Sequence, residues 1–340
     1  MRVRANSGTN LGSFRVKEHG RLGGTWNDII VTVLMRLYKC WPVLILLWAA
    51  RVWSCGAPPS SGLRVSGEDL AWKVENEHMI VDLGKNPGIG RNGQINTILV
   101  KGPNVLLTRG RATSTLHLSP NAAAGGQWAG INRWDPPNTW AVKSGRSSFR
   151  LEREGEMPGV PGLYVKTTYE FFAGAPAIAV EESVEATREV RLSLLRLDEW
   201  SFAPGADIPF SHLGWEESEG RVVVKKREKE ESLPLETRWL AFLSESKEFG
   251  FASVVEGFSV SDRAVLRNAA ARFAGDPHYF YRVLISSENR ALVAVPAGTR
   301  CGIRYWLYCF KPGKGSAALE PVSRFWRTLR HPVGVRIDGP

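Results

Sequence analysis

The strongest pattern in the chain is a two-residue alternation that runs through residues 163–186. One face carries mainly β-branched and aromatic side chains, first Val165, Thr167, Tyr169 and Phe171, then Ile178, Val180, Glu182 and Val184. The two halves are separated by Ala-Gly-Ala-Pro, in which Gly174 can adopt the positive φ of a tight turn and Pro176 lacks an N–H for a strand ladder. The pattern predicts two long antiparallel strands joined by a short turn.

Shorter alternating runs follow one another between residues 63 and 310. They are punctuated by many of the 34 Gly and 20 Pro residues, which is typical of an all-β chain. We see no break in composition between residues 63 and 330, so we expect a single domain over 67–335, built from two broad antiparallel sheets.

Helical spacing is found near the C-terminus, at residues 321–330. Val322, Phe325, Trp326 and Leu329 would share one face of a short helix there. A second short helix at 262–272 is supported only by Ser261 and Asp262 as capping residues. The sequence therefore predicts an all-β sandwich with one short C-terminal helix.

Residues 35–55 have the composition of a secretory signal. Arg36 and Lys39 precede an apolar run at 41–50 that is short for a membrane span. The sequence before Cys55 resembles the lipobox of bacterial lipoproteins, although Trp53 is bulky for that motif, so Cys55 is a candidate for acylation. Simple cleavage nearby and a retained anchor remain alternatives. We expect an exported protein, in the periplasm or at the cell surface, whose membrane contact is this signal or a lipid anchor.

The flanking segments fit that interpretation. Residues 1–34 are polar and Gly-rich without periodicity, which indicates a disordered extension or a mis-assigned start before Met35. Residues 56–66 are rich in Gly, Pro and Ser and are expected to form a linker.

The net charge of +10 is unevenly distributed. Eight of the 44 basic residues but only two of the 34 acidic residues lie in 1–55, so 56–340 carries +4. This does not favour a nucleic-acid partner, which usually selects a clustered basic face. Cys301 and Cys309 would lie about 26 Å apart in one extended strand, too far for a disulfide, and are expected to be buried thiols.

Four short motifs, in this order, resemble galactose mutarotase-like supersandwich domains. They are residues 74–82 with 93–98, the hairpin 169–176, 238–242 with 248–252, and 296–299 before the strand 305–310. The resemblance implies a large antiparallel β-supersandwich that handles carbohydrate, and it is closest to the sandwich domain of exo-rhamnogalacturonan lyase-type proteins. The Asn-His-x-Tyr-Phe-Asn stretch of aldose epimerases is missing, so an epimerase His/Glu pair cannot be carried over.

The loop at residues 125–140 is the best candidate for sugar binding. Aromatic platforms fit the C–H faces of sugars, and amide or charged groups fit the hydroxyl rims. The candidate residues here are Trp128, Asn132, Arg133, Trp134 and Trp140. Arg133 would suit a uronate carboxylate. The alternative is a long loop whose Trp side chains pin it to the sandwich.

A lyase that acts on uronates must neutralise the carboxylate and remove the neighbouring proton. His212 and Tyr281 are the candidate bases, each with ordinary packing as the alternative. Further candidates for substrate contact are His117, His278, Tyr279 and Arg282. Tyr281 and Arg282 would point to opposite faces of one strand unless a bulge intervenes. The carboxylate doublets, such as Asp198-Glu199, are weak evidence for a hydrolase for the same reason.

These observations favour a polysaccharide lyase that cleaves a uronate-containing glycan by β-elimination. The alternatives are a non-catalytic glycan-binding protein of a polysaccharide-uptake system and a structural domain without a sugar site. The partner expected is a polysaccharide or oligosaccharide. No cofactor is expected, and the sequence leaves a Ca²⁺ requirement open.

Overall fold

A computed structural model describes ten stretches of the chain. They are residues 62–84, 93–108, 116–119, 139–157, 160–201, 210–217, 220–226, 230–274, 279–287 and 291–329. All belong to one compact unit, Pro59–Pro340. The predicted extension and signal segment lie outside the described residues. The first strand begins at Arg64, inside the segment expected to be a linker.

The described strands form three main antiparallel sheets. The N-terminal sheet has the order β1-β2-β3-β4-β5, with bounds Arg64–Glu68, Ala71–Glu75, Met79–Leu83, Ile95–Val100 and Val105–Thr108. The large sheet has the order β14-β13-β16-β17-β21-β10-β9-β8-β7. Its strands are Val222–Lys226, His212–Glu216, Trp239–Ser244, Phe249–Val260, Arg300–Phe310, Ala177–Ala186, Leu163–Phe172, Ser148–Glu156 and Thr139–Ser144.

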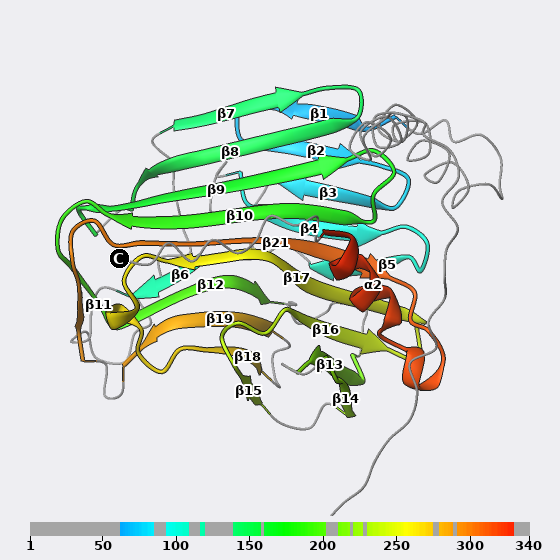
Figure 1. Cartoon of the computed structure of the whole chain (residues 1–340). Coiled ribbons are helices and arrows are strands. Elements are labelled where there is room, and N and C mark those ends of the chain that lie inside the picture. The colour runs from blue at the N-terminus through cyan, green and yellow to red at the C-terminus, as the bar shows by residue number, and fades with distance from the viewer. Residues whose placement is uncertain are drawn as a thin grey trace, which may run out of the picture. The chain divides into compact units, whose positions relative to one another are not determined.

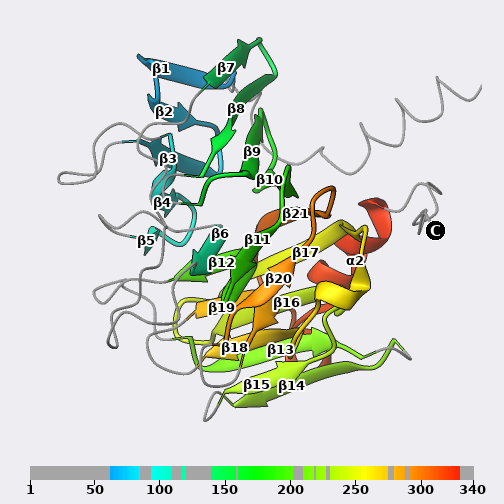
Figure 2. The same ribbon diagram turned by 90° about the vertical axis from the view of Figure 1, so that its left-hand side faces the viewer.

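The third sheet, which we call the β19 sheet, carries most of the site described below. Its order is β15-β18-β19-β12-β6, with bounds Glu231–Leu233, Ala270–Ala274, Tyr279–Ser286, Leu194–Ser201 and Leu116–Ser119. A two-stranded ribbon pairs β11 (Val190–Leu192) with β20 (Val293–Val295). The large sheet forms one layer, and both five-stranded sheets lie on the same side of it (Figures 1 and 2).

The predicted hairpin is confirmed as β9 and β10 at the middle of the large sheet. The two strands pair antiparallel from Leu163 opposite Ala186 to Phe171 opposite Ile178. Gly174 in the turn has a φ of 72°, the left-handed conformation that glycine adopts at no steric cost. The hairpin continues on both sides into the sheet, because β8 pairs with β9 and β21 pairs with β10.

One hydrophobic core joins the three sheets. The inner face of the large sheet packs its aromatic residues against both five-stranded sheets, since the ring of Phe149 lies 5.3 Å from Trp72 of β2, and Phe242 lies 5.3 Å from Phe273 of β18. Cys301 and Cys309 lie in this core as free thiols, as expected. Burial raises the pKa of the Cys301 thiol to about 12, so it is not a ready nucleophile.

The outer face of the large sheet is covered in part by α2 (Glu320–Leu329), the predicted C-terminal helix. Val322 and Trp326 pack there on Trp239, Val254 and Phe310. The second predicted helix is wrong beyond its first turn. Asp262 does accept a hydrogen bond from Ala264 N–H, but only the 3₁₀ turn η1 (Arg263–Val265) follows before β18 begins. Another 3₁₀ turn, η3 (Gly315–Ala317), precedes α2. None of the helices among the described residues has the length and apolar character that crossing a bilayer requires.

Candidate functional site

The two predicted catalytic residues lie on different sheets. His212 of β13 is opposite Leu243, which belongs to the cluster under α2, so its side chain faces the outer side of the large sheet. Tyr281 of β19 belongs to a small cluster with Leu194 and Val283 on the outer face of the β19 sheet. The core lies between these two faces, so the structure does not bring His212 and Tyr281 together. His212 Nδ1 lies 2.9 Å from Ser211 Oγ and 3.6 Å from Glu245 Oε1.

Most of the predicted sugar-binding loop lies outside the described residues. Five candidates lie outside the described residues, namely Trp128, Asn132, Arg133, Trp134 and His278. Trp140 is on β7, the edge strand of the large sheet, and is 46% exposed. The backbone of His117 is paired with Arg196 in the ladder between β6 and β12, and the backbone of Tyr279 is paired with Ser201.

The prediction for Arg282 is wrong. We expected it to contact substrate, but its side chain is only 1% exposed and faces the core. Its guanidinium forms an ion pair with Asp198 and donates a hydrogen bond to Thr237 O at 2.7 Å. Tyr281 and Arg282 do point to opposite faces of β19, as the alternation predicts, because Arg282 is opposite the buried Ala271 and Tyr281 is opposite Arg272.

The outer face of the β19 sheet gathers basic groups around Tyr281. The guanidinium carbon of Arg196 lies 4.0 Å from the centre of the Tyr281 ring, which is cation–π geometry. The Tyr281 hydroxyl donates to Glu230 Oε1 at 3.4 Å. Arg272 is the ladder partner of Tyr281 and lies 3.6 Å from the same Glu230. Two guanidinium groups therefore flank one tyrosine on the same face of a sheet.

A polar cavity adjoins this cluster. Its volume is about 510 Å³, and Arg272 forms part of its wall together with Ser232, Asn268, Ala269, Ala270, Ser286 and Ser287. The size is within the range of small-ligand sites, and the lining offers hydroxyl and amide groups that suit sugar hydroxyls. Among the described residues, no three His, Cys, Asp or Glu side chains gather closely enough to hold a metal ion.

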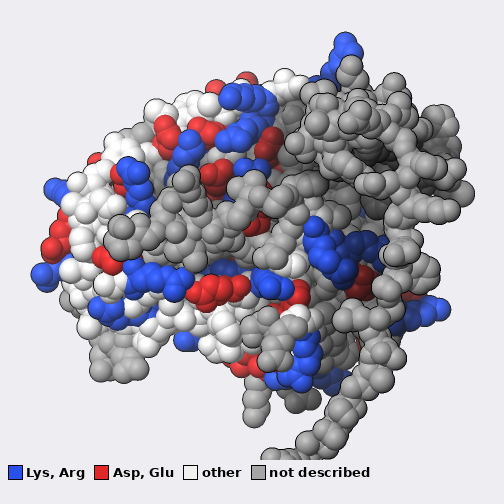
Figure 3. All heavy atoms as spheres, in the orientation of Figure 1, with Lys and Arg blue, Asp and Glu red and all other residues white. Residues whose placement is uncertain are grey.

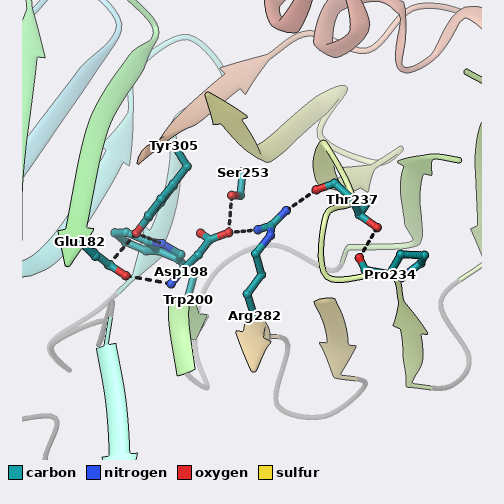
Figure 4. Close-up of polar contacts among 8 residues, drawn as sticks. All are labelled: Glu182, Asp198, Trp200, Pro234, Thr237, Ser253, Arg282 and Tyr305. Atoms are coloured by element: carbon teal, nitrogen blue, oxygen red, sulfur yellow. Dashed lines mark hydrogen bonds and ion pairs between the residues drawn. The ribbon is translucent and has the colours of Figure 1, made fainter. Parts of the chain in front are cut away.

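The sandwich interior below the cluster contains a buried polar network (Figure 4). Asp198 accepts hydrogen bonds from Ser253 Oγ at 2.6 Å and from Arg282, and its own N–H donates to Glu182 Oε2 at 2.9 Å. Tyr305 donates to Glu182 Oε1 at 2.9 Å and accepts from Trp200 Nε1 at 3.1 Å. The network thus joins β12 and β19 of the β19 sheet to three strands of the large sheet.

Burial dominates the electrostatics of this network. Loss of solvation raises the pKa of Asp198 to about 6, although the Arg282 guanidinium and the Ser253 hydrogen bond act in the opposite direction. Burial and the nearby Glu182 carboxylate also raise the pKa of the Tyr305 phenol well above its ordinary value. These groups are closed to solvent and are suited to hold structure, not to meet a substrate.

The outer face of the large sheet offers a different pattern of charge. Lys, Arg, Asp and Glu side chains are mixed over this face (Figure 3). They form ion pairs such as Arg150 with Glu152 at 3.0 Å, Lys166 with Glu152 at 2.8 Å, and Arg304 with Glu256 at 3.0 Å. Each of these cations has a carboxylate partner, as Arg272 has on the β19 sheet. The β19 sheet differs in that it also places Tyr281 between its two arginines.

Comparison with known proteins finds similar solved structures but no family and no activity. No protein-family model matches the sequence, and no curated protein does. The solved structures that resemble the chain include a TPR-domain containing protein from Parabacteroides distasonis (10% identity, 72% of this chain, 48% of that chain, TM-score 0.42). They also include a putative aldose 1-epimerase from Klebsiella pneumoniae (9% identity, 82% of this chain, 90% of that chain, TM-score 0.46). A third is a galactose mutarotase-like protein from Lactobacillus casei (9% identity, 71% of this chain, 100% of that chain, TM-score 0.41). The chain spans about half of the first of these.

The fold group that the sequence resembles is therefore among these structures. A nearest relationship to rhamnogalacturonan lyases stays a prediction. With scores below 0.5, these similarities do not reveal what this chain binds, so its function has to be inferred from the site itself.

Three residues of the cluster were not among the predicted site residues, namely Arg196, Glu230 and Arg272. Arg196 and Arg272 are charged positions inside otherwise apolar alternating runs, which marks them as outward-facing. That signal was available from the sequence. What it could not reveal is that the two arginines come from β12 and β18, on either side of β19, because that depends on the order of strands in the sheet.

Proposed function

We propose that this chain is a carbohydrate-active protein that binds an acidic glycan on the outer face of the β19 sheet. The observation that carries the proposal is the placement of Arg196 and Arg272 around Tyr281, beside a polar cavity of about 510 Å³. A planar guanidinium matches the carboxylate of a uronate in a bidentate arrangement. Hydroxyl and amide groups of the cavity would bind the hydroxyls of the same glycan.

We further propose that the glycan is cleaved by β-elimination. The arginines would neutralise the uronate carboxylate, which makes the proton at C5 easier to remove. Tyr281 would take that proton as a phenolate, after passing its own hydroxyl proton to Glu230 at 3.4 Å. The C4–O bond breaks and a C4–C5 double bond forms. Tyr281 then gives the proton taken from C5 to the departing oxygen and recovers its own proton from Glu230, which restores the site.

A non-catalytic glycan-binding protein is the second candidate. It is favoured by one observation, which is that Tyr281 is only 5% exposed, less than expected for a base that must reach a polymer. In this alternative Arg272, whose side chain is 31% exposed, would make the main contact with the carboxylate.

An absorbance assay separates the two candidates. The full-length protein is incubated with pectic, alginate and glycosaminoglycan polymers, and the unsaturated uronate is followed in the ultraviolet. A lyase is expected to give a steady rise with at least one polymer and no rise with a neutral glucan of matched length. Retention on an immobilised uronate polymer without any rise would favour the binding protein. If the protein gives no ultraviolet signal and is not retained on any uronate polymer, the proposed function is rejected.

A further inference from the structure

The pair formed by Arg196 and Glu199 is unusual for a strand. Residues three apart in a regular strand point to opposite faces, because side chains alternate with a period of two. Yet Arg196 Nη1 lies 3.5 Å from Glu199 Oε1, and both side chains are 11% exposed. Both must therefore face the same side of β12.

A bulge in β12 accounts for this. In the ladder with β19, Leu197 is opposite Arg282 and Trp200 is opposite Phe280. Two residues of β12, Asp198 and Glu199, therefore lie opposite the single residue Tyr281 of β19, which is the definition of a β-bulge. Asp198 has a φ of 50°, a left-handed conformation that is strained for a non-glycine residue. The extra residue lets Asp198 point into the core while Glu199 points outward.

The buried network holds this bulge from both sides. Before Glu199, the Asp198 carboxylate is bound by Ser253 and Arg282, and the Asp198 N–H is bound by Glu182 (Figure 4). After Glu199, Trp200 is bound to Tyr305, which is in turn bound to Glu182. A regular β12 would leave Arg282 without its buried carboxylate, so a strained backbone is retained opposite Tyr281.

We propose that Glu199 is a positioning residue of the acidic-glycan site, which it serves by holding the Arg196 guanidinium over the Tyr281 ring. This inference rests on the proposed function for its consequence in binding. Arg196 would otherwise have several rotamers to lose when a carboxylate binds, and this loss lowers affinity. With one edge fixed by Glu199 and its plane against Tyr281, the guanidinium is preorganised for the ligand.

The position of Arg196 can be measured without any ligand. The Nε–H signal of Arg196, assigned by its loss in Arg196→Lys, is expected to be shifted by the ring current of Tyr281 in an ¹⁵N-arginine NMR spectrum. In Glu199→Gln this signal should move toward the average arginine position. Glu152→Gln removes the matched ion pair with Arg150 on the other face and should leave the signal unchanged. An unchanged Arg196 signal in Glu199→Gln would overturn the positioning role.

Binding then tests the consequence. Glu199→Gln is expected to weaken the binding of a galacturonate oligosaccharide about tenfold by calorimetry, with Glu199→Asp intermediate and Glu152→Gln unchanged. If the unaltered protein binds no uronate, the proposed function fails, while the NMR signal still decides whether Glu199 positions Arg196. If it binds and Glu199→Gln binds equally well, the function stands and the positioning role is rejected. Should Glu199→Gln fold poorly, the same signal and affinity are read in Glu199→Asp, which must shift in the same direction.

Discussion

Replacing Arg282 by Met is expected to lower the free energy of unfolding by about 3–5 kcal/mol at neutral pH, because it leaves the buried Asp198 carboxylate without its cation. Asp198 Oδ1 already has no hydrogen-bond donor among the described residues, so little else can compensate. The change should be visible as an earlier midpoint in urea unfolding with an unchanged slope.

The loss should depend on pH in a defined direction. Burial already raises the pKa of Asp198 to about 6, and removal of Arg282 should raise it further. A carboxyl whose pKa is higher in the folded state stabilises the fold at pH values below its unfolded pKa of 3.8. This stabilisation is lost as the pH rises through the folded pKa. The deficit of Arg282→Met should therefore be smaller near about pH 5 than near about pH 8.

Asp198→Asn provides the contrast. It leaves the Arg282 guanidinium buried without a carboxylate and also removes the titration of Asp198, so its deficit should not grow between about pH 5 and about pH 8, in contrast to that of Arg282→Met. The double variant Asp198→Leu with Arg282→Met removes both charges and should recover part of the loss. Equal stability of Arg282→Met and the unaltered protein at pH 8 would contradict the buried ion pair.

Tyr281→Phe is expected to reduce the rate of elimination by about 10²–10⁴-fold, the usual contribution of a general base. The change removes only the hydroxyl, so the ring that supports Arg196 at 4.0 Å remains. Affinity for the glycan should accordingly change by less than about threefold. Both values follow from initial rates in the ultraviolet assay and from calorimetry on the same preparations.

His212→Gln is the matched control for this variant. His212 was the other base expected from the sequence, but it faces the outer side of the large sheet, away from Tyr281. Its replacement should leave the rate within about twofold of the original. Full activity in Tyr281→Phe together with a large loss in His212→Gln would move the active site to the opposite face of the sandwich.

The sequence predicted those features that depend on local periodicity. The hairpin β9–β10 was readable because its alternation and its Gly174 turn lie within 24 residues. The helix α2 was readable because Val322 and Trp326 have helical spacing, and both are buried on the large sheet. The split between Tyr281 and Arg282 followed from the two-residue period of a strand.

The rest depends on contacts between distant segments. Nothing local to Arg282 reveals Asp198, which lies 84 residues away, so an arginine in the core looked like an arginine in a site. Asp198 and Glu199 do point to opposite faces, as the alternation predicts, but the bulge decides that Asp198 enters the core and that Glu199 lies beside Arg196. A bulge is stabilised by its tertiary partners, here Ser253 and Glu182, and these cannot be assigned before the sheets are known.

Arg272 tests most directly whether an acidic glycan binds to the outer face of the β19 sheet. Arg272→Gln and Arg150→Gln remove one cation from the β19 sheet and from the large sheet respectively, and the two side chains are equally exposed. Calorimetry with a galacturonate oligosaccharide should give about 10–100-fold weaker binding for Arg272→Gln, the usual loss of a charge-assisted contact, and no change for Arg150→Gln. Unchanged affinity in Arg272→Gln, or a loss confined to Arg150→Gln, would contradict the account.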